Sequence, residues 1–131
     1  MIFVDSNIPM YLVGAPHPNK DAARAAVERC IGRGERMVTS AEVMQEILHR
    51  YVAIHRTDAI QPALDALLGL VDEVFPVEAV DVTNARDVLA ARAQISARDA
   101  LHVAVMKRRG VDTILSFDAG FDAVAWLERQ Y

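Results

Sequence analysis

Short apolar runs alternate with longer amphipathic stretches along the chain. The apolar runs have the length of buried strands and lie at residues 2–4, 37–39, 74–77 and 113–117. Between them, apolar residues recur at helical spacing, over residues 22–31, 43–51, 58–70, 82–93 and 96–109. Strands that alternate with helices predict an α/β fold, in which a short parallel sheet lies between helices in three layers.

Capping residues and helix breakers set the expected helix boundaries. Asn19, Ser40 and Ser96 each stand where an N-cap would begin a helix. Gly110 is expected to end the last long helix. Pro76 favours an edge position for the third strand, because proline cannot donate to a sheet ladder.

The composition fits one domain over residues 1–131. The hydrophobic fraction is 53%, which is enough for a core without disulfides. Cys30 is the single cysteine, so no intrachain disulfide can form. It stands among alanines at helical spacing and is expected to be a core residue rather than a catalytic thiol.

The charge and hydropathy pattern limits the partners that we expect. No apolar run approaches the ~18 residues of a membrane span, and the chain starts without a basic, signal-like segment. We therefore expect a cytoplasmic protein without membrane contact. The net charge of −4 disfavours a nucleic-acid binder, unless the acidic residues gather where a cation neutralises them.

Four acidic residues stand at positions typical of a site in an α/β sheet. Asp5 and Asp118 follow predicted strands, and sites of such folds form outside the carboxyl ends of the strands. Asp99 is in the first turn of a predicted helix, and Glu46 is on the helix after the second strand. If they converge, a divalent cation would relieve their repulsion, and oxygen ligands suit Mg²⁺ or Mn²⁺. The matching chemistry is metal-assisted phosphodiester hydrolysis.

Each acidic residue also has a structural alternative. Asp99 follows Ser96 by three residues, as in an acidic capping box. Glu46 could belong to a solvated helix face, and Asp118 could form a turn before Gly120. For Asp5 the functional interpretation is favoured even when the residue is taken alone.

The remaining polar residues point less clearly to a site. Asp122 is expected in a turn or cap rather than at a metal. His49 and His55 lack the spacing of a helical zinc pair. His102 is one helical turn after Asp99 and could reach the site, but a packed or surface position is favoured.

The order of the four acidic motifs resembles PIN-domain proteins of the VapC toxin type. Residues 1–7 resemble the first strand and acid of that family, with Asp5 matching. Residues 39–48 resemble its second motif through Glu46, residues 96–105 its third through Asp99, and residues 114–122 its last through Asp118. Ser116 replaces the commoner threonine, and Gly120 replaces a residue that is often acidic.

The resemblance implies a PIN-like fold and a Mg²⁺-dependent endoribonuclease that acts as the toxin of a toxin–antitoxin pair. It also implies a homodimer and an antitoxin partner. Asp5, Glu46, Asp99 and Asp118 would hold the metal, and Ser116 and Asn7 would orient a ligand or the attacking water. Three basic side chains are candidates for the path of the RNA, namely Arg50, Arg92 and Arg98. For each of them a position on a solvated face is favoured.

Two other functions compete with the ribonuclease. A dehalogenase-type phosphatase uses a strand-end aspartate as a covalent nucleophile, but it needs a second aspartate two residues later, where this chain has Asn7. A catalytically silent PIN-fold binding protein is the other alternative. The presence of all four acidic residues argues against it.

Overall fold

The first apolar run forms the centre of a five-stranded parallel sheet with the strand order β3-β2-β1-β4-β5. The computed structural model describes residues 1–91 and 94–131. Phe3 of β1 pairs with Val38 of β2 on one side and Ile114 of β4 on the other, and all three are fully buried. The strands are β1 (Ile2–Val4), β2 (Met37–Ser40), β3 (Glu73–Phe75), β4 (Thr113–Leu115) and β5 (Glu128–Gln130).

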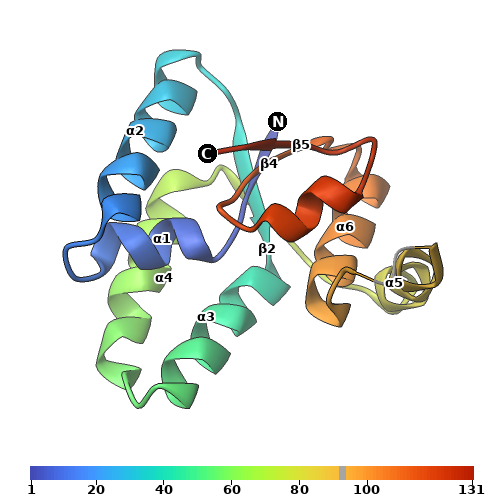
Figure 1. Cartoon of the computed structure of the whole chain (residues 1–131), viewed down its shortest axis with the longest axis horizontal. Coiled ribbons are helices and arrows are strands. Elements are labelled where there is room, and N and C mark those ends of the chain that lie inside the picture. Colours follow the sequence, from blue (N-terminus) through green and yellow to red (C-terminus); the bar gives the residue numbers. More distant parts are fainter. Residues whose placement is uncertain (92–93) are drawn as a thin grey trace.

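Helices cover both faces of the sheet, which gives the expected three layers (Figure 1). One layer holds α1 (Asn7–Val13), α2 (Pro18–Gly32) and α4 (Ile60–Leu70), and the other holds α5 (Ala79–Ala91) and α6 (Ala97–Arg109). Helix α3 (Ala41–Ala53) extends from the end of β2, beyond the carboxyl edge of the sheet. Two short 3-10 helices complete the fold, η1 (Thr57–Ala59) and η2 (Ala119–Ala123).

Local signals explain most helix ends. The hydroxyls of Ser40 and Ser96 accept hydrogen bonds from the third residue of the helices that they begin. Gly110 ends α6 with a φ of 70°, a left-handed conformation that glycine adopts without strain. Cys30 is buried in the core, as predicted. None of the helices in the described ranges is long and apolar enough to cross a membrane.

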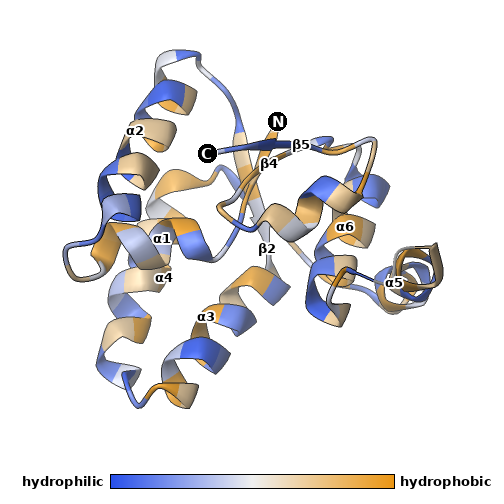
Figure 2. Cartoon of the chain, in the orientation of Figure 1, coloured by the Kyte–Doolittle hydropathy of each residue, from blue (hydrophilic) through white to orange (hydrophobic). Residues whose placement is uncertain are grey.

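The sequence-based boundaries differ from the structure in several places. Strand β3 spans Glu73–Phe75 instead of residues 74–77, and β4 ends at Leu115 instead of residue 117. Helix α2 is capped by His17 rather than Asn19, because the ring nitrogen of His17 accepts from the backbone of Asn19. The helix expected from residue 58 begins as η1, and α5 begins at Ala79 instead of residue 82. The expected end of α5 at 92–93 lies outside the described residues. Strand β5 was not predicted, because it is polar throughout (Figure 2).

Candidate metal centre

Asp5 is fixed at the carboxyl end of the central strand. Its backbone continues the ladder by donating to Leu115 at 3.1 Å, and its side chain is only 3% exposed. The backbone N–H of Ser6 donates to Oδ1 at 2.8 Å, and the hydroxyl of Ser116 donates to Oδ2 at 2.6 Å. Burial nevertheless raises the pKa of Asp5, because these donors and His102 offset only part of the lost hydration.

The end of β4 supplies the next part of the site. The hydroxyl of Ser116 accepts from the backbone of Asp118 at 3.0 Å and from the amide of Asn7 at 3.1 Å. Asn7 in turn accepts from the backbone of Phe117 at 3.3 Å. Asp118 accepts from the backbone of Gly120 at 2.8 Å, which caps η2. The two neighbouring strand ends are therefore tied together by side chains.

Asp99 reaches this edge from the first turn of α6. Burial and the charges of Asp5 and Asp118 raise its pKa to about 7. Gly120 lies close to both groups: a Cβ there would be 3.0 Å from Asp118 Oδ1 and 3.9 Å from Asp99 Oδ2. The charges of Asp5 and Asp118 therefore both act on Asp99, and the charge of His102 offsets part of their effect.

Glu46 lies beside this group but has its own partners. Its Oε1 accepts from the hydroxyl of Ser6 at 2.7 Å and lies 3.5 Å from Nε2 of His102. Its Oε2 lies 3.5 Å from Arg50 and 3.7 Å from Arg98. Burial opposes the charge of Glu46, but the bonds to His102 and Ser6 outweigh it and lower its pKa to about 2. Glu46 is therefore an ionised carboxylate whose charge is already compensated.

His102 is the site residue that the sequence analysis underrated. It is fully buried against Phe3, and one ring nitrogen lies within 4.8 Å of carboxylate oxygens of both Asp5 and Glu46. Burial opposes its charge, but the bond to Glu46 and the charge of Asp5 raise its pKa. The available signal was its spacing from Asp99, since residues three apart share a helix face.

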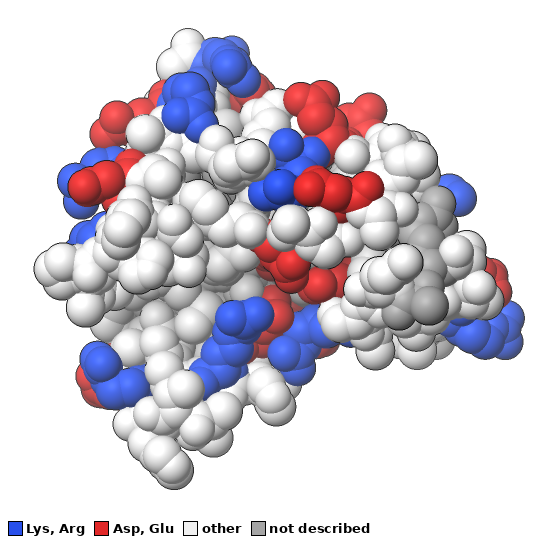
Figure 3. Space-filling view, viewed as in Figure 1, with Lys and Arg blue, Asp and Glu red and all other residues white. Residues whose placement is uncertain are grey.

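The donor set fits a hard divalent cation. Figure 3 shows acidic side chains in a central hollow with basic side chains at its rim. Burial and the charges of Asp5 and Asp118 both raise the pKa of Asp99, so a cation bound there would relieve part of this cost. Carboxylate oxygens are the ligands that Mg²⁺ and Mn²⁺ prefer, so the residues present suit such an ion.

The other polar residues considered from the sequence have different positions. Asp122 is exposed and pairs with Arg129 at 2.8 Å, outside the carboxylate cluster. Arg50 and Arg98 lie at the rim of the site, where both pair with Glu46. Arg92 lies outside the described residues.

Residues 2–127 match the PIN domain family. The chain belongs to the PIN-domain family. It is 57% identical to ribonuclease VapC13 of Mycobacterium tuberculosis over 129 residues, which is 98% of either protein. It is 45% identical to ribonuclease VapC23 of the same species over 118 residues, covering 90% of this chain and 93% of that relative. The resemblance inferred from the motif order is thereby confirmed.

Solved PIN-domain structures confirm the fold class. The toxin VapC20 of Mycobacterium tuberculosis, described as cleaving the sarcin-ricin loop, superposes with a TM-score of 0.78 at 25% identity, covering 98% of each chain. A VapBC-1 structure from nontypeable Haemophilus influenzae gives a TM-score of 0.69 at 14% identity, covering 99% of this chain and 97% of that one. The three-layer fold with a short parallel sheet is therefore that of VapC toxins.

Proposed function

We propose that this PIN-domain protein is a Mg²⁺-dependent endoribonuclease that acts as the toxin of a toxin–antitoxin pair. The observation that carries the proposal is the acidic group at the carboxyl edge of the sheet. Ligand atoms of Asp5, Glu46 and His102 lie within 4.8 Å of one another, and the charges of Asp5 and Asp118 act on Asp99 and help burial to raise its pKa to about 7. The names of its whole-length relatives, all VapC ribonucleases, support RNA as the substrate.

In this mechanism the carboxylates of Asp5, Asp99, Asp118 and Glu46 would hold the cation. A bound Mg²⁺ would offset charge on the scissile phosphate and lower the pKa of an attacking water. Ser116 holds Asp5 Oδ2 in place, and the amide of Asn7 holds Ser116. The cation and a proton compete for the carboxyl of Asp99, so we expect cation affinity to rise with pH.

Arg50 and Arg98 have two tasks in this proposal. Both lie near Glu46, and Arg98 also pairs with Glu42 at 3.3 Å. The side chain of Arg50 is about half exposed and that of Arg98 is 29% exposed, so both can also meet RNA phosphates. Basic side chains around an acidic hollow explain how a protein with a net charge of −4 could bind RNA. The acidic residues gather at the cation, and the basic residues face the substrate.

The proposal includes a protein partner and a second copy of the chain. Structures of VapBC complexes among the neighbours support an antitoxin partner. Exposed apolar side chains provide surface for such contacts on α3 and the segments that follow it, namely Leu48, Val52, Ile54 and Leu68. We propose a homodimer in the cytoplasm, which light scattering of the purified chain would test.

A cleavage assay tests the proposed activity. The purified chain is incubated with single-stranded RNA of random sequence and Mg²⁺, Mn²⁺ or EDTA. We expect cleavage with either metal, none with EDTA, and none by a folded Asp5→Asn variant. Equal cleavage in EDTA, or by Asp5→Asn, would refute the metal centre. The phosphatase alternative is not favoured, because Asn7 occupies the position of its second aspartate.

A further inference from the structure

A cavity of about 370 Å³ opens beside the carboxylate cluster. It lies between α1, the loop before α2, and α3, and its lining includes Asn7, Tyr11, His17 and Arg50. Asn7 also binds Asp5 and Ser116, and Arg50 pairs with Glu46. The cavity is therefore continuous with the site, and its size is in the range of small-ligand pockets.

Aromatic rings form one wall of this cavity and continue past the site. Tyr11 lies 5.1 Å from the ring of His17 and 5.4 Å, edge to face, from Phe117. Phe117 is followed by the ring of Tyr131 at 6.3 Å, and Arg129 lies 4.3 Å from the centre of that ring. The backbone of Phe117 is tied to the site, because its N–H donates to Oδ1 of Asn7, which also lines the cavity.

The chemistry of this wall suits a planar, uncharged ring system. The surface over α1 carries no charged side chains and borders the acidic hollow (Figure 3). Single-stranded RNA is recognised largely by stacking its unpaired bases on Tyr, Phe and His rings, while cationic side chains meet the phosphates. Arg50 stands at the rim, between the cavity and the cluster.

We propose that this cavity receives an unpaired base next to the scissile phosphate, with Tyr11 and His17 as the stacking surface. This inference rests on the proposed ribonuclease function and narrows its substrate to RNA in which that base is unstacked. A base held in the cavity would fix the register of the strand, so the cavity would set the base preference beside the cut.

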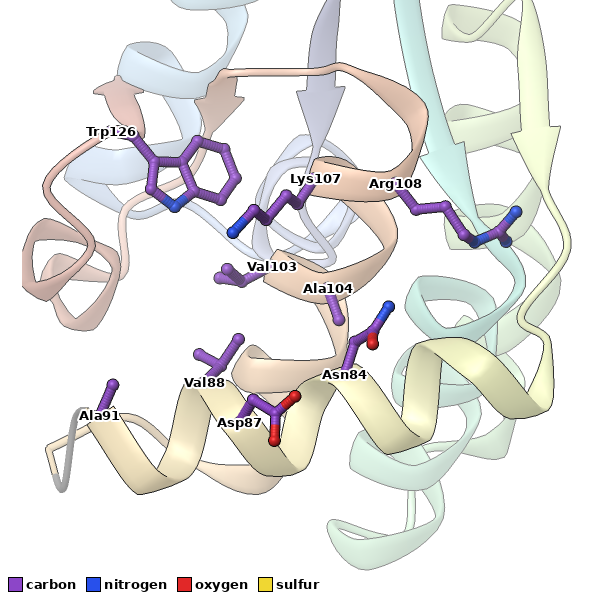
Figure 4. A pocket seen from close by; sticks show the side chains of 9 residues that line it. All are labelled: Asn84, Asp87, Val88, Ala91, Val103, Ala104, Lys107, Arg108 and Trp126. Atoms are coloured by element: carbon purple, nitrogen blue, oxygen red, sulfur yellow. The ribbon is translucent and has the colours of Figure 1, made fainter.

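The chain offers matched variants for this test. Tyr11→Ala removes the stacking ring, whereas Tyr11→Phe keeps it. His17→Asn removes the other ring but keeps an N-cap for α2, since asparagine is a good cap. Trp126→Leu is the control, because Trp126 is an exposed aromatic residue in a separate cavity of about 510 Å³ between α5 and α6 (Figure 4). Thermal melting checks that each variant folds.

The assay measures kcat/KM and the sequence of the cut ends on single-stranded RNA of random sequence. We expect Tyr11→Ala to lose about five- to hundredfold in kcat/KM, the usual effect of removing one base-stacking ring. We also expect it to lose the preference at one base beside the cut. His17→Asn should shift both in the same direction, Tyr11→Phe should recover most of what Tyr11→Ala loses, and Trp126→Leu should match the parent. In an Asp99→Asn background, an RNA carrying 2-aminopurine at that base should show stacking-induced quenching that Tyr11→Ala abolishes.

The outcomes distinguish a failure of the proposed role of the cavity from a failure of the proposed ribonuclease activity. If the parent chain cleaves no RNA with Mg²⁺, the proposed function fails. If the parent cleaves but Tyr11→Ala and His17→Asn keep its kcat/KM and base preference, only the role of the cavity fails, and the cavity is left to a partner protein. An equal loss in Trp126→Leu would also overturn the inference, because the effect would then not belong to this cavity.

Discussion

Replacing Asp99 by asparagine tests whether the acidic residues form a metal centre or are unrelated to one another. In the metal-free protein, the pKa of Asp99 is raised to about 7 by burial and by the charges of Asp5 and Asp118. Asparagine has nearly the same shape and no charge, so it removes the repulsion. Ser96 still caps α6 in the variant, because its hydroxyl accepts from the backbone of residue 99.

The expected size follows from the pKa of Asp99. A carboxyl whose pKa rises from 3.8 to about 7 costs about 4 kcal/mol of folding free energy once it is ionised. Asp99 is half-buried, so solvent screens part of the repulsion, and we expect about 1–2 kcal/mol to be realised. The lost charge at the N-terminus of α6 costs ~0.3–1 kcal/mol in the opposite direction. The net gain of about 1 kcal/mol corresponds to a Tm higher by roughly 3–5 °C.

Thermal melting with EDTA and with Mg²⁺ measures both parts of this prediction. Mg²⁺ at a hundredfold excess over its Kd should stabilise the parent by about 2.7 kcal/mol, and Asp99→Asn should lose most of that gain. A metal-free variant that is less stable than the parent, with an unchanged Mg²⁺ effect, would refute the reasoning. Asp99 would then only stabilise the start of α6.

Three further predictions concern pH, orientation and a helix end. In EDTA, the free energy of unfolding of the parent should fall as pH rises from about 5 to 8, because the folded-state pKa of Asp99 lies above its unfolded value. Urea titrations at each pH measure this fall. If the parent shows no fall relative to Asp99→Asn, the prediction is contradicted. Ser116→Ala removes the 2.6 Å bond to Asp5 and should lower kcat/KM about tenfold or more, whereas Ser116→Thr should retain activity. Gly110→Ala should destabilise the fold by about 1 kcal/mol in chemical denaturation, because the φ there is 70°, whereas Gly69→Ala in open space should not.

The sequence predicted the parts of the fold that local patterns determine. β1, β2 and β4 are apolar runs bounded by polar turns, and buried strands of a parallel sheet have this pattern. The edge position of β3 followed from Pro76 and is confirmed by the strand order. β5 could not be found in this way, because Glu128, Arg129 and Gln130 are polar and join the sheet through backbone pairing with β4.

The same distinction applies to the site. Asp5 and Asp118 could be located because strand ends of a parallel sheet meet at one edge, and the structure brings them together with Asp99 and Glu46. How their charges are balanced could not be read from the sequence. Glu46 is neutralised by His102 and two arginines, and this depends on the way α3 and α6 pack across the edge of the sheet.

The central claim is that Asp5, Asp99 and Asp118 hold a catalytic divalent cation. The most direct test is a crystal structure of the protein grown with Mn²⁺, in which anomalous scattering locates the metal. The account predicts an anomalous peak at coordination distance, about 2.1–2.2 Å, from oxygens of these three carboxylates, and no peak there in Asp99→Asn. A parent crystal with this site empty at saturating Mn²⁺, from protein that cleaves RNA in the same buffer, would contradict it.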